Sequence, residues 1–400
     1  MWIYIWDTEI KWIYLWDTPV KEVYLWDAKI RPKARTFTIS WTEQSNMSSG
    51  WTYSDDAAGL TAGSWDFDDF FWYSAVLLNT SGVETAEMTQ SWWVFTGAMT
   101  TLGNITSGDN VMIKFPIRWI KMTKSWSVVT LSITEELNKT WYQYYAFQTW
   151  TLSNPWTAKD AFYLWAYRWY VQNSYLLSWS WKTPTWNVSQ ANFCTYAKNN
   201  SSNYNILCLY QRMYVNALYM MKYGNPNAQT VIWMWYNSWT GVVTTWWTNN
   251  QTSATYWTSS NTSQIKLFWL EDRWGATWEY IWGCYTDSNK LLYAMLSWRS
   301  WAMSWWESTW TTVAQTSSYY CLSSIAGTNK AMFAPIWTVS SGAVNQYYCD
   351  AAFIAWWTSL FSSWAGSWSA EWNRNWPFKW DQTLSPSSAY TYVWARLMYL

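Results

Sequence analysis

The chain has 400 residues, a net charge of zero, no histidine and only 12% charged residues. This length is enough for two or three domains with a sizeable core. The zero net charge and the lack of a basic patch argue against a nucleic-acid partner. The absence of histidine excludes Ser-His-Asp catalysis, Cys-His catalysis and histidine zinc sites. No apolar run is long enough to cross a bilayer, so we expect no membrane span.

Tryptophan is unusually common in this chain, and glycine is rare. There are 45 tryptophans but only 14 glycines, although glycine normally makes up roughly 7% of residues. Three ten-residue repeats open the chain within residues 1–32, and each has Ile or Val, Tyr and an aliphatic residue followed by Trp-Asp. The first three residues favour a strand, and the Trp-Asp step falls where a tight hairpin turn needs a positive φ. Glycine adopts a positive φ without strain, whereas a bulky side chain does not.

We therefore predict that many of these tryptophans are glycines in the protein that the source organism makes. A UGA codon that the organism reads as glycine would appear as tryptophan when translated with another genetic code. From the turn pattern alone, glycine suits Trp6, Trp16, Trp26 and Trp126, the last of which separates two expected strands. The alternative is a true tryptophan-rich protein that uses its indoles as a stacking surface.

The pattern along the chain predicts an α+β fold with a β-rich N-terminal part. Residues 33–115 alternate apolar and polar side chains in short runs, and further strands are expected at 127–134 and around 142–148. Asn187-Val188-Ser189 can cap a short helix that ends near residues 196–198. A longer helix is expected over 207–223, ended by Gly224. We expect these two helices to pack on an antiparallel sheet.

Two C-terminal segments resemble a known fold. Residues 267–283 (LFWLEDRWGATWEYIWG) resemble a signature of the C-type-lectin fold in phage tail proteins, variable proteins of diversity-generating retroelements and formylglycine-generating enzymes. In that signature Trp274 and Trp278 match true tryptophans, whereas Trp269 matches a glycine. Residues 392–397 (YVWARL) resemble the closing strand of the family, in which Trp394 again stands for glycine. The resemblance implies that the strand carrying Trp278, the helix over 207–223 and the last strand share one domain.

The expected organisation has three parts. Residues 1–32 are ten-residue β-repeats, residues 33–115 form a β-rich domain, and residues 116–400 form a C-type-lectin-like domain with two helices packed on antiparallel sheet. With the resemblance added, the positions expected to be encoded by UGA are Trp6, Trp16, Trp26, Trp126, Trp269 and Trp394. UGG codons are expected at Trp274 and Trp278.

The candidate ligand-binding stretch is 361–392, which is rich in Ser, Asn and Tyr and precedes the expected closing strand. Tyrosine offers rigid contact area, and Asn and Ser offer hydrogen bonds, as in adaptable binding loops. The resemblance implies that loops at this place contact a receptor. The candidate contact residues are Glu371, Asn373, Asn375, Tyr390 and Tyr392. The alternative is an ordinary long surface loop.

Acidic and cysteine residues suggest two weaker kinds of site. One acidic cluster offers oxygen ligands of the kind that calcium prefers, but it lacks EF-hand spacing, so a solvated loop without metal is expected. This cluster consists of Asp55, Asp56, Asp66, Asp68 and Asp69. The five cysteines show no metal-binding spacing, and we expect isolated buried thiols. They are Cys194, Cys208, Cys284, Cys321 and Cys349.

The sequence thus predicts a non-enzymatic receptor-binding or adhesion protein of phage-tail or cell-surface type. It would need no cofactor and would bind a surface glycan or protein through C-terminal loops, in an extracellular, cell-surface or virion setting. Such tips are often trimeric, so a homotrimer is one expectation. A formylglycine-generating type of enzyme is an alternative, which a paired, reactive cysteine in a cleft would favour. The C-terminal cysteines Cys321 and Cys349 do not match the motif of that enzyme, so its catalytic role does not carry over to them. A structural fibre or virion component is another, which packing of 361–392 against the rest of the chain would favour.

Overall fold

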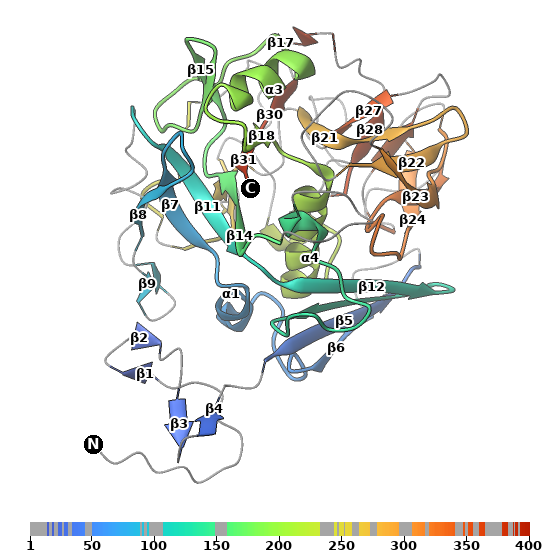
Figure 1. Cartoon of the computed structure of the whole chain (residues 1–400). Coiled ribbons are helices and arrows are strands. Elements are labelled where there is room, and N and C mark those ends of the chain that lie inside the picture. The colour runs from blue at the N-terminus through green and yellow to red at the C-terminus, as the bar shows by residue number, and fades with distance from the viewer. Residues whose placement is uncertain are drawn as a thin grey trace.

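A computed structural model describes most of the chain after residue 33. The described residues are 34–44, 50–88, 107–148, 158–232, 264–272, 278–295, 306–316, 320–340 and 393–400, with shorter interrupted pieces at 14–30, 90–95, 244–257, 347–354 and 360–390. Strands are the dominant regular structure (Figure 1). The abundance of Thr, Tyr and other aromatic residues agrees with this, because such side chains fit a pleated, half-buried surface.

A four-stranded antiparallel sheet lies at one end of the molecule. Its order is β12 (Trp119–Ser125), β13 (Val128–Thr134), β5 (Thr36–Thr42) and β6 (Trp51–Asp55). Apolar side chains alternate along β5 and β13, and those of Phe37, Ile39 and Leu131 are buried, as are several threonines and a serine between them. This period of two is the one that the sequence shows, and it turns one face of the sheet towards the core.

A second, six-stranded sheet joins early and late parts of the chain. Its order is β18 (Tyr204–Ile206), β31 (Leu397–Tyr399), β14 (Ala161–Trp165), β11 (Asn110–Pro116), β7 (Ser74–Leu78) and β8 (Glu84–Glu87). The boundary suggested at residues 115 and 116 runs through both sheets, because β5 pairs with β13 and β11 pairs with β14. Residues 34–88 therefore share sheets with strands from the part of the chain after residue 116.

The largest sheet is built from the C-terminal third of the chain. Its strands are β23 (Glu307–Thr312), β22 (Leu291–Ala294), β21 (Trp278–Thr286), β27 (Leu360–Trp364), β28 (Trp380–Gln382), β26 (Ala351–Ile354), β24 (Tyr320–Ile325) and β25 (Pro335–Val339), with β30 (Val393–Ala395) beside β21. β30 runs parallel to β21, with Val393 opposite Trp278 and Ala395 opposite Tyr280. β30 therefore lies beside the strand that carries Trp278, as expected, whereas β31 joins the six-stranded sheet.

Six further strand pairs are short. They are β1 (Tyr14–Leu15) with β2 (Thr18–Pro19), β3 (Val23–Leu25) with β4 (Ala28–Ile30), β9 (Gln90–Ser91) with β10 (Val94–Phe95), β15 (Tyr170–Gln172) with β16 (Tyr175–Leu177), β17 (Val188–Ser189) with β29 (Ala389–Tyr390), and β19 (Lys266–Leu267) with β20 (Leu270–Glu271). The first two pairs confirm strand pairing within the N-terminal repeats. Trp6, Trp16 and Trp26 themselves lie outside the described residues.

Short helices accompany the sheets: α1 (Trp65–Phe71), η1 (Tyr145–Phe147), α3 (Gln190–Lys198), α4 (Leu209–Tyr223) and α5 (Ala228–Ile232). Both helices expected from the sequence are present as α3 and α4. The Ser189 hydroxyl accepts a hydrogen bond from the Asn192 backbone N–H at 3.2 Å, which caps α3. Gly224 ends α4 with φ 65°. None of the helices in the described parts combines the length and the apolarity that crossing a bilayer requires.

The predicted α+β class is nevertheless wrong, because the described structure is mostly β and consists of several antiparallel sheets. All residues of α4 are buried, and it contacts β5 and β21, which belong to different sheets. α3 contacts β16, β17 and β18 instead. Helix spacing and caps are local signals and located both helices correctly. The pairing of distant strands, which decides the class, leaves no such local signal.

Candidate ligand-binding face

The hairpin of β15 and β16 presents polar and aromatic side chains to solvent on one side. Tyr170 pairs with Leu177 and Gln172 pairs with Tyr175, so Tyr170, Gln172 and Tyr175 share one face of the hairpin. Gln172 and Tyr175 are exposed, and Tyr170 is half-buried. The Lys182 ammonium lies 5.3 Å from the centre of the Tyr170 ring. We call Tyr170, Gln172, Tyr175 and Lys182 the hairpin face.

Hydrogen bonds fix the hairpin to its neighbours. The side-chain amide of Asn199, at the end of α3, donates to the Ser174 carbonyl at 2.7 Å. The adjacent Asn200 amide donates to the Leu176 carbonyl at 2.8 Å. On the other strand, the Val171 backbone N–H donates to the Thr185 hydroxyl at 2.9 Å. The hairpin face is therefore held on a rigid support, as binding surfaces on loops require.

The backbone of Tyr390, a predicted contact residue, lies at the end of the molecule that carries β15, β17 and α3. In β29 it pairs with Val188 of β17, directly before α3, and Figure 1 shows β15, β17 and α3 at the same end. The Tyr390 side chain is not described. Glu371, Asn373, Asn375 and Tyr392 lie outside the described residues.

Part of the predicted ligand stretch is interior rather than loop. Phe378, Trp380 and Asp381 are fully buried, and β28 pairs with β26 and β27 inside the largest sheet. The Gln382 amide oxygen accepts a hydrogen bond from the Thr286 hydroxyl at 2.9 Å. Residues 378–382 are therefore unavailable to a ligand. Only the other residues of the predicted ligand-binding stretch, 361–392, could contact one.

A buried network of charges surrounds the segment that resembles the lectin signature. The Glu279 carboxylate accepts hydrogen bonds from Arg212 of α4 and from Arg396, each at 3.1 Å. Arg396 also donates to the backbone carbonyls of Trp165 at 2.9 Å and Glu271 at 3.1 Å. All of these charged side chains are less than 12% exposed. Arg396 thus fastens the end of the chain to β21 and β14, which indicates a structural role.

Asp272 and Glu271 extend the network. Arg168 forms an ion pair with Asp272 at 3.3 Å, and both side chains are buried. Burial lowers the pKa of Arg168 to about 10, although Asp272 opposes the shift. The Thr248 hydroxyl donates to Glu271 at 2.8 Å. These carboxylates already have partners inside the protein, so they are poorly placed to serve as general acid or base.

Lys266 is the most unusual charge in this region. Its ammonium donates to the carbonyls of Thr248 at 3.2 Å and Gln251 at 2.8 Å and lies 4.0 Å from the Trp269 ring centre. Burial lowers the pKa of Lys266 from 10.5 to about 7, and the charge of Glu271 opposes this only in part.

The lowered pKa of Lys266 predicts that stability rises with pH. The unfolded chain keeps the proton on Lys266 up to about pH 10.5, whereas the folded chain loses it near pH 7. The unfolded state therefore binds more protons in this window, and the free energy of unfolding should rise by at most about 1.4 kcal/mol per pH unit. Urea unfolding at pH 7, 8 and 9 measures the slope. Lys266→Met should flatten the profile, and parallel profiles for the two proteins would show that Lys266 is not the cause.

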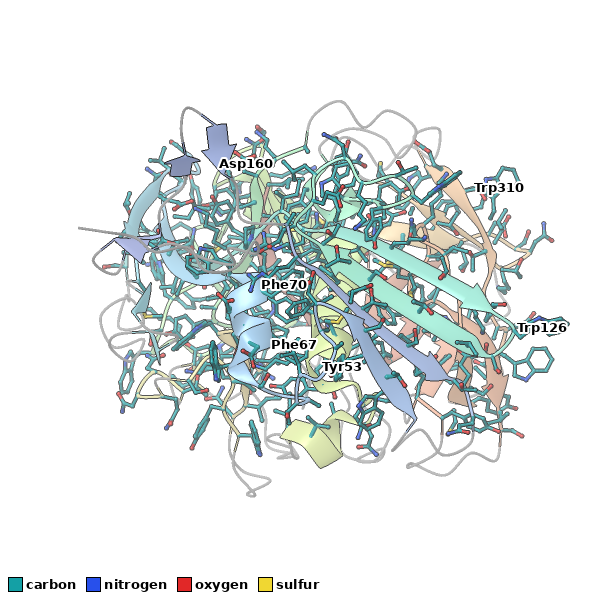
Figure 2. The ribbon with its side chains drawn as sticks, turned by 90° about the horizontal axis from the view of Figure 1, so that it is seen from below. Tyr53, Phe67, Phe70, Trp126, Asp160 and Trp310 are labelled. Carbon is teal, nitrogen blue, oxygen red and sulfur yellow. The ribbon has the colours of Figure 1, made fainter. Side chains whose placement is uncertain are left out.

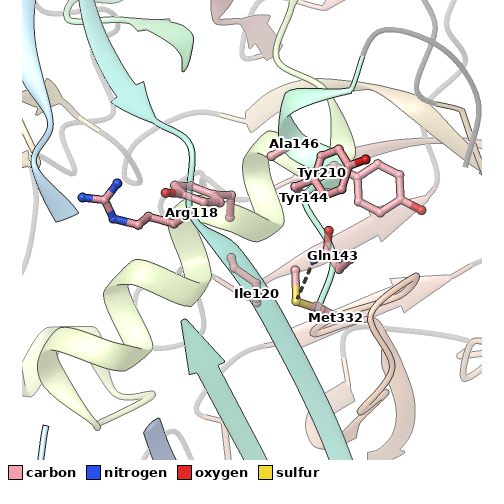
Figure 3. A pocket seen from close by; sticks show the side chains of 8 residues that line it. Arg118, Ile120, Gln143, Tyr144, Ala146, Tyr210 and Met332 are labelled. Carbon is pink, nitrogen blue, oxygen red and sulfur yellow. Dashed lines mark hydrogen bonds between the residues drawn. The ribbon is translucent and has the colours of Figure 1, made fainter. Parts of the chain in front are cut away.

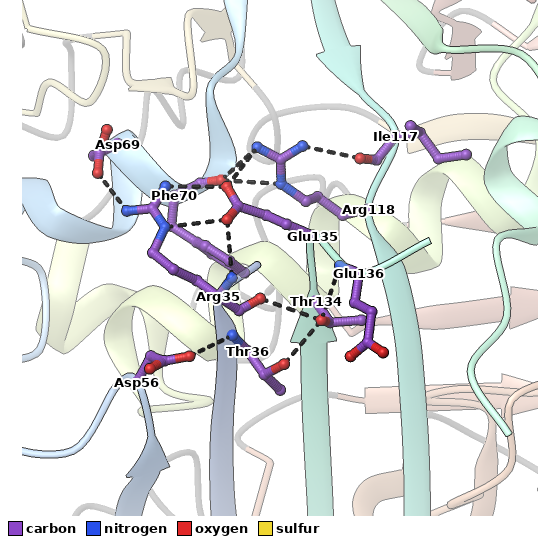
Figure 4. Close-up of polar contacts among 10 residues, drawn as sticks. All are labelled: Arg35, Thr36, Asp56, Asp69, Phe70, Ile117, Arg118, Thr134, Glu135 and Glu136. Atoms are coloured by element: carbon purple, nitrogen blue, oxygen red, sulfur yellow. Dashed lines mark hydrogen bonds and ion pairs between the residues drawn. The ribbon is translucent and has the colours of Figure 1, made fainter. Parts of the chain in front are cut away.

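The acidic cluster is not a solvated loop. Three of its members lie in α1, and Asp68 and Asp69 hold ion pairs with Lys222 at 2.6 Å and Arg35 at 2.5 Å. Figure 4 shows Arg35 between Asp69 and Glu135. These pairs tie α1 to α4 and to the four-stranded sheet. Within the described residues no group of acidic or cysteine side chains is arranged to hold a metal ion.

The cysteines of the described residues behave as interior side chains. Cys194, Cys208, Cys284 and Cys321 are all buried, as expected, but Cys194 and Cys284 lie close enough to Cys208 to help raise its pKa, so these three thiols are not isolated. Burial raises the pKa of Cys194 to about 12. A thiol with such a pKa is protonated at neutral pH and is a poor nucleophile. Cys349 lies outside the described residues.

A small internal space lies between β12, η1 and α4, and Figure 3 shows its lining. The lining side chains include Arg118, Gln143, Tyr144, Tyr210 and Met332. The space has no room even for a water molecule, so it is a packing gap rather than a binding site.

The sequence did contain a signal for the hairpin face. Residues 170–177 (YVQNSYLL) have Asn-Ser between two short runs with β-forming residues, which is typical of a hairpin. Asn173 and Ser174 both have positive φ, at 52° and 62°. The approach of Lys182 to Tyr170, which makes the face more than a plain hairpin, could not be read from the spacing.

When the chain is compared with models of protein families and with curated proteins, it matches none of them.

Proposed function

We propose that the protein is a non-enzymatic receptor-binding protein that recognises a cell-surface glycan through the hairpin face. The observation that carries the proposal is the grouping of two tyrosines and an amide on one face of a fixed hairpin, where Gln172 and Tyr175 are exposed and the Lys182 ammonium lies beside Tyr170. Tyrosine rings stack on sugar rings, and the Gln172 amide and Lys182 ammonium can hydrogen-bond to hydroxyl or carboxylate groups. A glycan is favoured over a protein ligand because the face is small and polar.

Two further observations support a binding role over catalysis. The buried carboxylates Glu271, Asp272 and Glu279 are engaged with arginine, threonine and glutamine side chains of the same chain. The strand that carries Tyr390 is held by β17, so the end of the predicted ligand stretch lies near the face. Phage-tail or cell-surface attachment remains the setting that we propose for such a protein.

The test is binding to an array of cell-surface oligosaccharides. We expect at least one glycan to bind, and Tyr170→Ala combined with Lys182→Ala to weaken that binding at least tenfold, the loss expected when interface anchors are removed. Both side chains are only half-buried, so the melting temperature should change little.

The chain offers a matched control. Lys139 also lies 5.3 Å from the centre of a tyrosine ring, that of Tyr142, near the four-stranded sheet. Tyr142→Ala combined with Lys139→Ala removes the same groups and should leave glycan binding unchanged. Equal losses in both double variants, or an array without any bound glycan, would contradict the proposal.

A structural fibre or virion component is the second candidate, and one observation favours it. Residues 378–382, inside the stretch proposed from the sequence to bind a ligand, pack against the protein's own body. If this role is the correct one, the purified protein should assemble into large oligomers and bind no glycan.

A further inference from the structure

Six tryptophans of the described residues have a backbone conformation that suits glycine. Their φ angles are 55° for Trp72, 55° for Trp126, 70° for Trp141, 61° for Trp181, 63° for Trp269 and 59° for Trp310. In this left-handed region the Cβ of an L-residue crowds the following carbonyl oxygen. Only Asn, Asp and glycine visit it routinely, and tryptophan is among the bulkiest residues that could be placed there.

The ends of two helices allow a direct comparison. α4 ends at Gly224, with φ 65° and a hydrogen bond from its N–H to the Met220 carbonyl at 2.8 Å. α1 ends in the same manner at Trp72, with φ 55° and a hydrogen bond from its N–H to the Asp68 carbonyl at 2.9 Å. The left-handed residue that ends a helix is usually glycine. Trp72 therefore occupies a glycine position.

Two hairpin turns also place a tryptophan at a position that glycine normally occupies. Ser125 pairs with Val128, so Trp126 is the first of two turn residues, and it alone of the two has a positive φ. That is the pattern of a type II′ turn, whose first central residue is glycine. Leu267 pairs with Leu270, and both residues between them, Phe268 and Trp269, have positive φ. Glycine is the favoured second residue of such a type I′ turn.

Trp310 lies in an irregularity of β23. Leu292 pairs with Thr311, but the next residue, Tyr293, pairs with Ser308, so Thr309 and Trp310 bulge out of the ladder. Glycine with a positive φ is common in β-bulges. Trp310 is 83% exposed and Trp126 is 94% exposed, and Figure 2 shows both indoles projecting from the body of the protein. Their indoles therefore have little packing that would justify the strain.

We infer that these six positions are glycine in the protein made by its source organism, whose ribosomes read UGA as glycine. Four of them, Trp72, Trp141, Trp181 and Trp310, show no recognisable turn motif in the sequence and are identified here by backbone geometry. Three independent motifs, a helix end, hairpin turns and a bulge, lead to the same residue type. The inference is independent of the proposed function.

Other tryptophans belong to the core and remain tryptophan. Trp165 of β14 and Trp380 of β28 are fully buried, and neither has a positive φ. The printed tryptophans are thus of two kinds, which a single codon could not encode. The exposed indoles of Trp126 and Trp310 are then no stacking platform for a ligand, whereas the hairpin face keeps its tyrosines and lysine.

Peptide mass spectrometry of the protein from its source organism tests the inference. Trypsin cleavage after Lys124 and Lys139 releases residues 125–139 (SWSVVTLSITEELNK), which contain Trp126. Cleavage after Lys159 and Arg168 releases residues 160–168 (DAFYLWAYR), which contain Trp165. We expect the mass of glycine at position 126 and the mass of tryptophan at position 165. The coding DNA should carry TGA at the six positions and TGG at positions 165 and 380.

Two results would overturn the inference. Tryptophan at position 126 in the natural protein, or TGG at most of the six positions, would show that the strained backbone carries indoles after all. Glycine at both positions 126 and 165 would show that backbone geometry does not separate the two kinds. Neither result would bear on glycan binding by the hairpin face, which is measured separately.

Discussion

Substituting glycine for five exposed tryptophans together is expected to raise the free energy of unfolding by about 3–5 kcal/mol. The five are Trp72, Trp126, Trp141, Trp181 and Trp310. A non-glycine residue in the left-handed region costs about 1–2 kcal/mol. Each glycine gives back roughly 0.4–1 kcal/mol through the greater freedom of the unfolded chain. The sites lie in different elements, so their effects should add. The gain is large beside a typical total stability of about 5–15 kcal/mol.

Trp269 is not included in this set, because glycine there would relieve backbone strain but would also remove a buried indole. Its indole is buried and lies under the Lys266 ammonium. Removing a buried aromatic side chain usually costs about 3–5 kcal/mol, which exceeds the strain that glycine would relieve. The codon at this position, rather than a stability measurement, identifies the residue.

The control for the glycine set is alanine at the same five positions. Alanine removes the indoles but keeps a Cβ, so it leaves the backbone strain in place and should give little gain in urea unfolding. Trp337→Gly is the second control, because Trp337 is 66% exposed in β25 without a positive φ. Glycine there should destabilise the protein slightly. If alanine and glycine raise the free energy of unfolding equally, the cause is the loss of surface indoles and not the relief of backbone strain.

Local features of the fold were predictable from the sequence, and distant ones were not. Ser189 at the start of α3 and Gly224 at the end of α4 are signals that a few neighbouring residues carry, and both helices lie where the sequence predicts them. The hairpin of β12 and β13 was equally local. The ion pair between Arg212 and Glu279, 67 residues apart in sequence, had no counterpart in any local pattern. The proximity of Arg396 to Glu279 followed only from the family resemblance.

The residue types at turns and helix ends also limit what the sequence shows. Glycine is the strongest local signal for turns and helix ends. With tryptophan at positions 72 and 310, neither the end of α1 nor the bulge of β23 has a local sequence signal, and the sequence predicts a loop where the acidic residues of α1 lie. Among the candidate contact residues, Tyr390 alone has a described backbone position. The sequence does not predict the hairpin face, because the approach of Lys182 to Tyr170 leaves no signal in the spacing, and part of the predicted stretch 361–392 is buried.

Breaking the buried charge network should destabilise the protein strongly. The Glu279 carboxylate pairs with both Arg212 and Arg396, and the three side chains are nearly inaccessible to solvent. Glu279→Gln keeps the shape of the side chain but removes the negative charge that both guanidinium groups contact. Removing one partner of a buried ion pair costs about 3–5 kcal/mol, because the remaining charge stays desolvated. The urea midpoint should fall accordingly.

Two further variants test whether the loss of stability in Glu279→Gln comes from the buried network or from the loss of any charged side chain. Glu136→Gln removes the partner of Lys139 in an exposed pair at 3.0 Å and should cost below about 1 kcal/mol. Arg212→Met in the Glu279→Gln background removes one of the uncompensated charges and should recover part of the loss, which a double-mutant cycle measures as a coupling energy. Arg396 should not be substituted in this cycle, because its guanidinium also bonds the carbonyls of Trp165 and Glu271. A Glu279→Gln protein as stable as its parent would mean that water, rather than protein, surrounds these arginines.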